Sequence, residues 1–477
     1  MNGGDKKLKT DHLLRSFPEK EGIPSAVLLD MLTELEKLDS LHSIMLLRHG
    51  KVCMEGWWHP YSPEIPHILF SLSKSFVSAA VGIAQAERLL SVSDKLISFF
   101  PEYESAVTDP RMKEVTLRHL LTMTSGHALC ARSSMLADPE GNWARGFLAS
   151  ALSYEPGTHF AYNSAASYML SAVLHKVTGE NVREFLMPKL FEPLGITPGI
   201  WECCPLNINT GGWGLYLKTA DIAKFAQLLL NGGRWYGQQL IQEDYLHEAT
   251  SGQADTSANE WPDWKLGYGY QFWKSSYGFR ADGASGQYAL VIPEKDMAIA
   301  ITAGVEDMQQ ILTVIWEKLI PAVQEECLLP SPENMEKLTG KLRSLQIYPA
   351  AGELEKRHEP QTWHFAPNKS GITAVSVSFS ERECRLEFDT VKGTEILTAG
   401  FGFHCCGELQ LNDHMKRKVA ASAAWKDEKI LEIHICCYEC AFQEIFTIDF
   451  NSADAPFSGS CRFNTFREPF LPVLTTV

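Results

Sequence analysis

The chain has 477 residues, of which 45% are apolar and 21% charged, and its formal net charge is −15 at pH 7. A chain of this length exceeds what one hydrophobic core usually serves, so we expect two domains and a sizeable core. The negative charge has the wrong sign for neutralising phosphates or anionic lipid headgroups. We therefore expect neither a nucleic acid nor a membrane as a partner.

The N-terminal residues show no apolar segment of the kind that directs secretion, and no apolar stretch of the chain is long enough to cross a bilayer. Without an export signal, the 12 cysteines are expected to be reduced thiols. Adjacent pairs such as Cys203-Cys204 support this interpretation, because neighbouring cysteines bridge each other poorly. The sequence therefore predicts a cytoplasmic protein.

The first predicted elements are a helix and a hairpin. Residues 1–22 are polar and are predicted to form a loose N-terminal arm. A helix is predicted to begin near Pro24 and to continue to Leu38, because leucines recur at helical spacing. A β-hairpin with its turn at His49-Gly50 follows.

The middle of the chain is mostly helical, and strands return only after it. Predicted strands at 287–292 and 297–301 lie far in sequence from the first hairpin. The economical arrangement is one antiparallel sheet built from both ends of this region, flanked by helices, with a helical subdomain inserted between them. The helices predicted in the insertion are 75–90, 116–123, 168–177 and 220–230.

The pattern changes after a predicted helix at 311–323. Residues 23–325 are predicted to form the α/β domain, and residues 326–345 a linker. Beyond the linker, apolar and polar residues alternate as in half-buried antiparallel strands, so we predict an all-β C-terminal domain over 346–477. The segments that alternate in this way are 374–379, 385–388, 430–435 and 444–448.

The first segment with a chemical signature is Ser71-Leu72-Ser73-Lys74, the only Ser-x-x-Lys in the chain. An apolar helix begins within it, and helix positions three apart share a face, so the Lys74 ammonium can reach the Ser71 hydroxyl. In a first helical turn, free backbone N–H groups and the helix dipole favour negative charge on Ser71. The pattern predicts a nucleophilic Ser71 activated by Lys74. The alternative is a helix-capping serine followed by a solvated lysine.

The second segment is Phe160-Ala161-Tyr162-Asn163-Ser164, which leads into a predicted helix. A tyrosine acts as a base near neutral pH only if its pKa falls by about 3 units from about 10, which takes about 4 kcal/mol. One nearby lysine in a partly desolvated site can supply most of that shift. Ordinary packing is the alternative role for Tyr162.

The third segment, Arg280-Ala281-Asp282-Gly283-Ala284-Ser285-Gly286-Gln287, immediately precedes a predicted strand. Its small residues would let a substrate lie against the strand edge. The strand backbone could then donate an N–H to an oxyanion, alongside the N–H of Ser71. Taken alone, the same segment is more typical of a glycine-containing hairpin turn.

Together, the three segments resemble the class C β-lactamases and penicillin-binding serine hydrolases, a family that also contains esterases, DD-peptidases and amide hydrolases. The resemblance implies the family's α/β fold and an acyl-enzyme on Ser71, with Lys74 as the adjacent proton acceptor. It further implies that Tyr162 is the general base that activates water, and that the backbone N–H groups of Ser71 and Ala284 form the oxyanion hole. The resemblance spans residues 40–305 in matching order and includes 44–56, 115–126, 211–215, 218–223 and 292–294.

Two positions depart from the family pattern. Many relatives have Tyr-x-Asn in the second segment, where this chain has Ser164, a hydrogen-bonding group of shorter reach. Many also carry Lys-Thr-Gly or His-x-Gly in the third segment, where this chain has Ala281-Asp282-Gly283. A carboxylate in place of a cation disfavours substrates that bear a carboxylate, such as penicillins. The predicted oxyanion and substrate-binding residues are Ser164, Asp282, Gly283 and Ala284.

The sequence therefore predicts a serine hydrolase that acts on a small ester or amide without a cofactor. The alternatives are a β-lactamase or DD-peptidase, and a non-catalytic ligand-binding protein on the same fold. Whether Lys74 or Tyr162 is the resting base stays open, as does the oligomeric state. No metal site is predicted, because the candidate ligands lie on separate predicted strands and buried thiols are commoner. Those candidate ligands are His404, Cys405, Cys406, His434, Cys436, Cys437 and Cys440.

Overall fold

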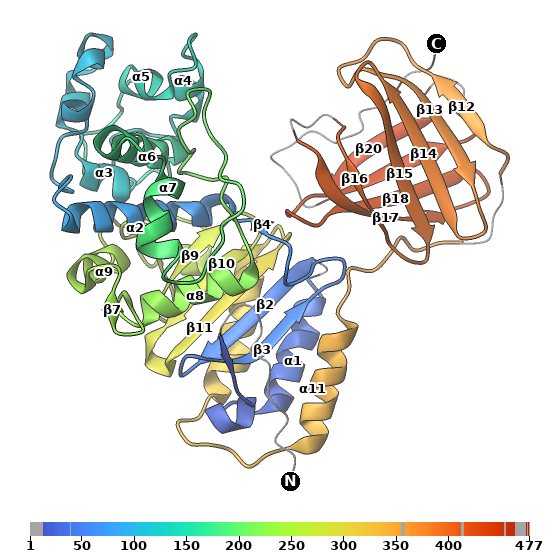
Figure 1. Cartoon of the computed structure of the whole chain (residues 1–477), viewed down its shortest axis with the longest axis horizontal. Coiled ribbons are helices and arrows are strands. Elements are labelled where there is room, and N and C mark those ends of the chain that lie inside the picture. Colours follow the sequence, from blue (N-terminus) through green and yellow to red (C-terminus); the bar gives the residue numbers. More distant parts are fainter. Residues whose placement is uncertain are drawn as a thin grey trace.

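A sheet built from both ends of the first domain forms its centre, as the sequence predicts (Figure 1). The computed structural model describes residues 13–38, 40–353, 358–411, 415–452 and 455–462, together with Leu474 and Thr476. Within these residues the sheet has seven strands in the order β1-β3-β2-β11-β10-β9-β8. The strands are β1 (Leu14–Arg15), β2 (Leu41–Arg48), β3 (Lys51–Trp57), β8 (Trp273–Lys274), β9 (Phe279–Gly283), β10 (Gln287–Ile292) and β11 (Met297–Ala303).

The central strand β2 is buried along its whole length because both faces of the sheet are covered. Successive side chains of a strand point to opposite faces, so Met45 and Leu47 join one hydrophobic core while Ile44 and Leu46 join the other. Helices α2 (Ser73–Ala86) and α8 (Thr219–Leu230) belong to the first core. Helices α1 (Ser25–Glu36) and α10 (Met308–Val314) belong to the second. This layering explains why β2 reads as a nearly continuous apolar run.

The predicted helical subdomain is confirmed between β3 and β8, and it lies on one side of the sheet (Figure 1). It approaches the sheet where the short strands β4 (His67–Ile68) and β5 (Tyr216–Leu217) pair, just before the Ser-x-x-Lys segment. Its other elements are α3 (Leu117–Leu121), α4 (Arg132–Leu136), α5 (Trp143–Leu148), α6 (Ser164–Thr178), α7 (Val182–Leu186), α9 (Glu243–Thr250) and the strands β6 (Arg234–Trp235) and β7 (Gln238–Gln239).

The described part of the predicted N-terminal arm is folded against the sheet, which corrects the expectation of a loose arm. β1 pairs in parallel with β3, and the nearby Glu21 carboxylate is buried. That carboxylate accepts hydrogen bonds from Lys51 (2.8 Å) and Ser16 (2.6 Å). A buried charge needs such partners, and they fix the segment in place. Residues 1–12 lie outside the described residues.

The predicted linker also contains structure that the sequence analysis missed. Helix α11 (Pro332–Ser344) lies within it and contacts α1 and β3 of the first domain. Leu338 is buried in the second core, and Leu342 packs against the same core. Met335, Leu338 and Leu342 follow one another at helical spacing, a signal that was present in the sequence. The predicted domain boundaries themselves stay a prediction.

The C-terminal region is the predicted all-β domain, a half-barrel whose strands alternate between core and surface. Isolated bridges from Phe365 to Thr476 and from Phe457 to Leu474 add to its edges. Large side chains such as Trp363 and Trp425 fill its interior. Its strands are β12 (Gln361–His364), β13 (Ile372–Phe379), β14 (Glu383–Thr390), β15 (Gly393–Phe401), β16 (Cys405–Leu409), β17 (Arg417–Trp425), β18 (Ile430–Cys437), β19 (Gln443–Asp449) and β20 (Phe457–Arg462). Across the described ranges, no helix combines the length and apolar character needed to cross a membrane.

Candidate active site

Ser71 lies in a tight 3₁₀ turn, η2 (Phe70–Leu72), that runs directly into α2. The turn begins with Phe70 at a φ of 45°, a left-handed conformation that is rare for a bulky side chain. The Ser73 hydroxyl braces the turn, since it donates to the Phe70 carbonyl (2.7 Å) and accepts from the Leu215 amide (3.1 Å). These bonds fix the backbone on both sides of Ser71.

Lys74 is buried beneath Ser71, as the helical spacing predicts. Its Nζ donates to Ser71 Oγ (2.8 Å) and to the Gly212 carbonyl (2.6 Å), and the residue is only 1% exposed. Burial lowers the pKa of the Lys74 ammonium from 10.5 to about 7, because removal from water disfavours the charged form. A large fraction of Lys74 is therefore a neutral amine near neutral pH, with a lone pair beside the serine hydroxyl.

Tyr162 lies just before α6 and is the third predicted catalytic residue at Ser71. Asn163 holds the loop there, because its side-chain oxygen accepts from the Ala165 amide and the Ala131 amide, both at 3.1 Å. The Tyr162 side chain hydrogen-bonds to Ser71. Lys74 Nζ lies over the Tyr162 ring, 4.9 Å from its centroid. The structure thus brings the three predicted catalytic side chains together.

The expectation that Lys74 lowers the tyrosine pKa is wrong for this arrangement. Burial, and then the nearby Asp282 carboxylate, raise the pKa of the Tyr162 hydroxyl above its ordinary value of 10. Lys74, whose Nζ lies over the ring, does not offset this rise. Tyr162 is therefore a neutral hydroxyl near neutral pH, able to donate a hydrogen bond.

The third predicted segment forms the end of β9 and contacts the Ser71 turn. A Cβ on Gly283 would lie 2.1 Å from the Leu69 carbonyl oxygen and 3.0 Å from the Leu72 nitrogen, so only glycine allows this approach. Asp282 and Ala284 line the same cavity as Ser71. The absence of a side chain at Gly283 thus allows Asp282 and Ala284 to lie close to Ser71.

Asp282 is not a lone carboxylate, because a buried arginine lies beside it. Arg280 Nε donates to Asp282 Oδ2 (3.0 Å), and Trp273 also hydrogen-bonds the carboxylate. Burial raises the pKa of the Asp282 carboxyl, while Arg280 opposes that rise. Arg280 was not among the site residues predicted from the sequence. Its spacing two residues from Asp282 on a strand, which places both side chains on one face, was the available signal.

Ser71 opens into a cavity of about 680 Å³, named here the tryptophan cavity. The predicted substrate-binding residue Ser164 lies on its wall, together with Asp282 and Ala284. Its apolar lining went unpredicted, because it comes from the loop before β8, from β8 itself and from the start of α10. The other lining residues are Cys130, Tyr162, Ala258, Asn259, Glu260, Trp261, Trp264, Trp273 and Met308.

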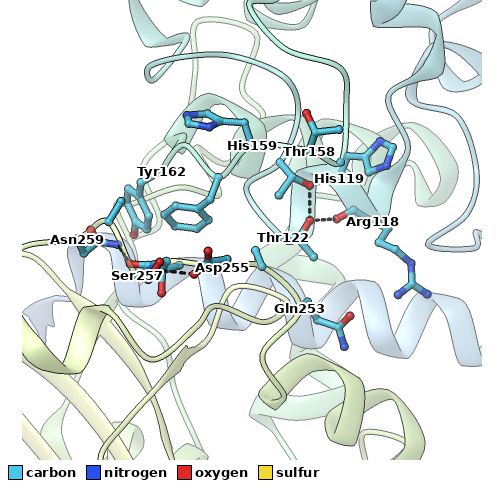
Figure 2. Close-up of a pocket in the computed structure, with 16 residues that line it drawn as sticks. Arg118, His119, Thr122, Thr158, His159, Tyr162, Gln253, Asp255, Ser257 and Asn259 are labelled. Atoms are coloured by element: carbon cyan, nitrogen blue, oxygen red, sulfur yellow. Dashed lines mark hydrogen bonds between the residues drawn. The ribbon is translucent and has the colours of Figure 1, made fainter.

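A second cavity of about 780 Å³, named here the polar cavity, adjoins the first and shares Tyr162, Ala258 and Asn259 with it. Figure 2 shows Tyr162 and Asn259 at one end of it and Arg118 and His119 at the other. Its lining is more polar than that of the tryptophan cavity, and the other lining residues are Thr122, Thr124, Gly157, Thr158, His159, Phe160, Gln253, Ala254, Asp255, Thr256 and Ser257.

The candidate metal ligands of the C-terminal domain have other partners. His404 Nε2 hydrogen-bonds to the Ile347 carbonyl (3.0 Å), and the Cys405 thiol donates to Glu383 (3.6 Å). Among the residues that the structure describes, no group of three or more His, Cys, Asp or Glu side chains is arranged to hold a metal ion.

The chain is similar in sequence to known proteins that have different activities. The chain is 29% identical to a lovastatin esterase of Penicillium rubens over 169 residues, covering 31% of this chain and 42% of the esterase. It is 25% identical to a D-aminopeptidase of Brucella anthropi over 170 residues, covering 32% of this chain and 31% of that protein. The matched regions thus span less than half of these two relatives.

The fold is also found in solved structures. The crystal structure of SurE superimposes with a TM-score of 0.52 at 14% sequence identity, covering 87% of this chain and 97% of SurE. The family model described as Beta-lactamase matches residues 10–309, which is more than half of the chain and contains all three segments with predicted catalytic or substrate-binding residues. The chain therefore belongs to the Beta-lactamase family and has its serine hydrolase fold.

Proposed function

We propose that the chain is a serine hydrolase that forms an acyl-enzyme on Ser71 and acts on small esters or amides. One observation carries the proposal: a buried Lys74, its pKa lowered to about 7, lies with its Nζ 2.8 Å from Ser71 Oγ. A serine hydroxyl attacks a carbonyl only when a neighbouring base takes its proton. A buried neutral amine at hydrogen-bond distance is such a base.

In acylation, neutral Lys74 accepts the Ser71 proton as Oγ bonds to the substrate carbonyl carbon. The negative charge that develops on the carbonyl oxygen is stabilised by the backbone N–H groups of Ser71 and Ala284. Tyr162 then gives its hydroxyl proton to the leaving group and is reprotonated by Lys74. The leaving group departs as an alcohol or amine, and the acyl group stays on Ser71.

Deacylation follows the same proton path in reverse. Water attacks the acyl carbon while its proton passes through Tyr162 to Lys74. The bond to Ser71 Oγ breaks, and Lys74 returns the proton to the serine. This scheme assigns Lys74 as the resting base and Tyr162 as a neutral relay, in agreement with the opposite effects of burial on the two pKa values.

The two cavities suggest how a substrate lies. Because the leaving group takes its proton from Tyr162, it must project toward that residue, which lines both cavities. We therefore place the leaving group in the polar cavity and the acyl group against Trp261, Trp264 and Trp273. Asp282 in the tryptophan cavity disfavours a carboxylate on the acyl side. Neutral esters and amides fit these constraints better than penicillins.

The proposal is tested by the intact mass of wild type and Ser71→Ala after treatment with a fluorophosphonate. We expect a single adduct on wild type and none on the variant. If folded wild type forms no adduct and shows no Ser71-dependent hydrolysis of an activated ester, the proposal is wrong and a non-catalytic ligand-binding role is favoured. A penicillin treated in parallel distinguishes the third possibility, since turnover or a stable acyl adduct would identify a β-lactamase or DD-peptidase.

A further inference from the structure

The turn between β18 and β19 of the C-terminal domain, residues 437–442, is named here the hairpin tip. In Figure 1 the end of this sheet reaches the first domain beside β4. There the Ile68 amide donates to the Glu439 carbonyl (2.8 Å), so the hairpin tip bonds to the backbone three residues before Ser71. Phe442 packs on Phe70, the residue next to Ser71, with ring centroids 6.0 Å apart.

Other bonds hold the hairpin tip in this position. The Tyr61 hydroxyl donates to the Cys440 carbonyl (3.0 Å). Gln443 donates to Ser40 (3.1 Å), at the start of β2. The tip is buried where it docks, since Cys440 is 0% exposed. The contact is therefore desolvated and hydrogen-bonded, as in a permanent interface.

A further bond reaches the strand that pairs with β4. Arg417 of β17 donates to the Tyr216 hydroxyl (2.6 Å), and the backbone of Tyr216 pairs with Ile68. The C-terminal domain thus holds both strands of the short β4–β5 ladder. That ladder leads directly into the turn that carries Ser71.

The Ser71 turn needs such support because of its backbone. Phe70 has a φ of 45°, and a bulky residue keeps such a conformation only where its surroundings over-determine it. Phe442 contacts the Phe70 ring, and Glu439 holds the preceding strand. Residues 437–442 line neither the tryptophan cavity nor the polar cavity, so the hairpin tip contacts the turn without lining either cavity.

We propose that the hairpin tip is a positioning element of the active site, with Phe442 as its central positioning residue. It fixes Phe70 and so sets the orientation of the Ser71 hydroxyl toward Lys74 and the substrate carbonyl. This inference rests on the proposed function of Ser71. It gives the C-terminal domain a part in turnover, distinct from any part in substrate binding.

The test uses the full chain with Phe442→Ala, Phe442→Leu and the matched control Phe379→Ala, a half-buried phenylalanine of the same domain away from the interface. We expect Phe442→Ala to lower kcat and the rate of Ser71 labelling by a fluorophosphonate by about 10- to 100-fold, with KM within about twofold of wild type. Phe442→Leu restores most of the rate, and Phe379→Ala leaves both rates unchanged.

Wild-type labelling and kcat in a folded Phe442→Ala would overturn the inference, as would an equal loss in Phe379→Ala. If Phe442→Ala does not fold, Tyr61→Phe removes the hydroxyl that donates to the Cys440 carbonyl of the hairpin tip, and a lower kcat at unchanged KM is expected in the folded variant. Wild-type kcat in folded Tyr61→Phe would then overturn the inference. Absence of labelling in wild type itself would instead contradict the proposed function, so the two failures are distinguishable.

Discussion

Lys74 and Tyr162 are buried together beside Ser71, and burial acts on them in opposite directions. Removal from water disfavours the charged form of each group, so it favours neutral amine at Lys74 and neutral hydroxyl at Tyr162. Near pH 7 a large fraction of Lys74 is therefore a neutral amine that can accept a proton, while Tyr162 is a neutral hydroxyl that can donate one. This division of roles supports the proposal that Lys74 is the resting base.

Removing either group is expected to slow the chemistry more than it weakens binding. Lys74→Ala and Tyr162→Phe each lose a proton-transfer group that acts in the transition state, so we expect kcat to fall by about 10²- to 10⁴-fold with KM changed only a few-fold. Steady-state kinetics on an activated ester measure this, with the exposed Tyr154→Phe as control. Near-wild-type rates in both variants would rule out the mechanism.

The lowered pKa of Lys74 also predicts the pH dependence. Protonated Lys74 cannot accept the serine proton, so activity is lost as pH falls through about 7 and reaches a plateau above it. An unshifted lysine would place this inflection above pH 10. The measurement is kcat/KM for a neutral ester from about pH 5 to about pH 9. A flat profile over that range would contradict the assignment.

Much of the residue-level site could be predicted, because its chemistry is encoded locally. Helical spacing alone placed Lys74 against Ser71. By contrast, the direction of the Tyr162 pKa shift depends on burial and on Asp282, which is distant in sequence. The tryptophan lining likewise depends on how the loop before β8 folds back over the site, and no local pattern reveals that.

At the scale of elements, the site depends on the close approach of β9 to the Ser71 turn. Gly283 permits this approach, since a Cβ there would collide with the Leu69 carbonyl. We expect Gly283→Ala to displace β9 and to lower fluorophosphonate labelling of Ser71 by about 10- to 100-fold. Gly407→Ala is the control, because a Cβ there meets nothing within 4 Å. Equal labelling in both variants would show that the approach is not needed.

Helices and strands whose apolar residues recur at regular helical spacing or form continuous runs were predicted well. The helices around residues 25–36 and 219–230 and the strands at 287–292 and 297–303 lie within a few residues of their predicted places. Helix α11 was missed because proline, serine and glutamate dominate its start, and only three apolar residues mark its buried face. The N-terminal segment was missed because a buried Glu21 resembles a surface glutamate in sequence.

At the scale of the whole molecule, the α/β domain and the half-barrel meet at the segment that carries the nucleophile. The alternation that predicts the half-barrel strands says nothing about where their turns dock. The hairpin tip contributes a backbone carbonyl to Ile68 and an aromatic ring to Phe70, and neither contact has a sequence signature. The architecture of each domain could therefore be predicted from the sequence, but the way in which the two domains contact each other could not.

The pairing of β2 with β11 has a consequence for synthesis. Leu46 pairs with Ile299, so the central strand waits for a partner made roughly 250 residues later. At ribosomal speeds of about 5 to 20 residues per second, that wait lasts about 10 to 50 seconds. Throughout it the nascent chain carries an apolar strand with one edge unpaired, which is a template for aggregation. A chain that ends before Met297 lacks β11 and leaves that edge of β2 without its partner strand.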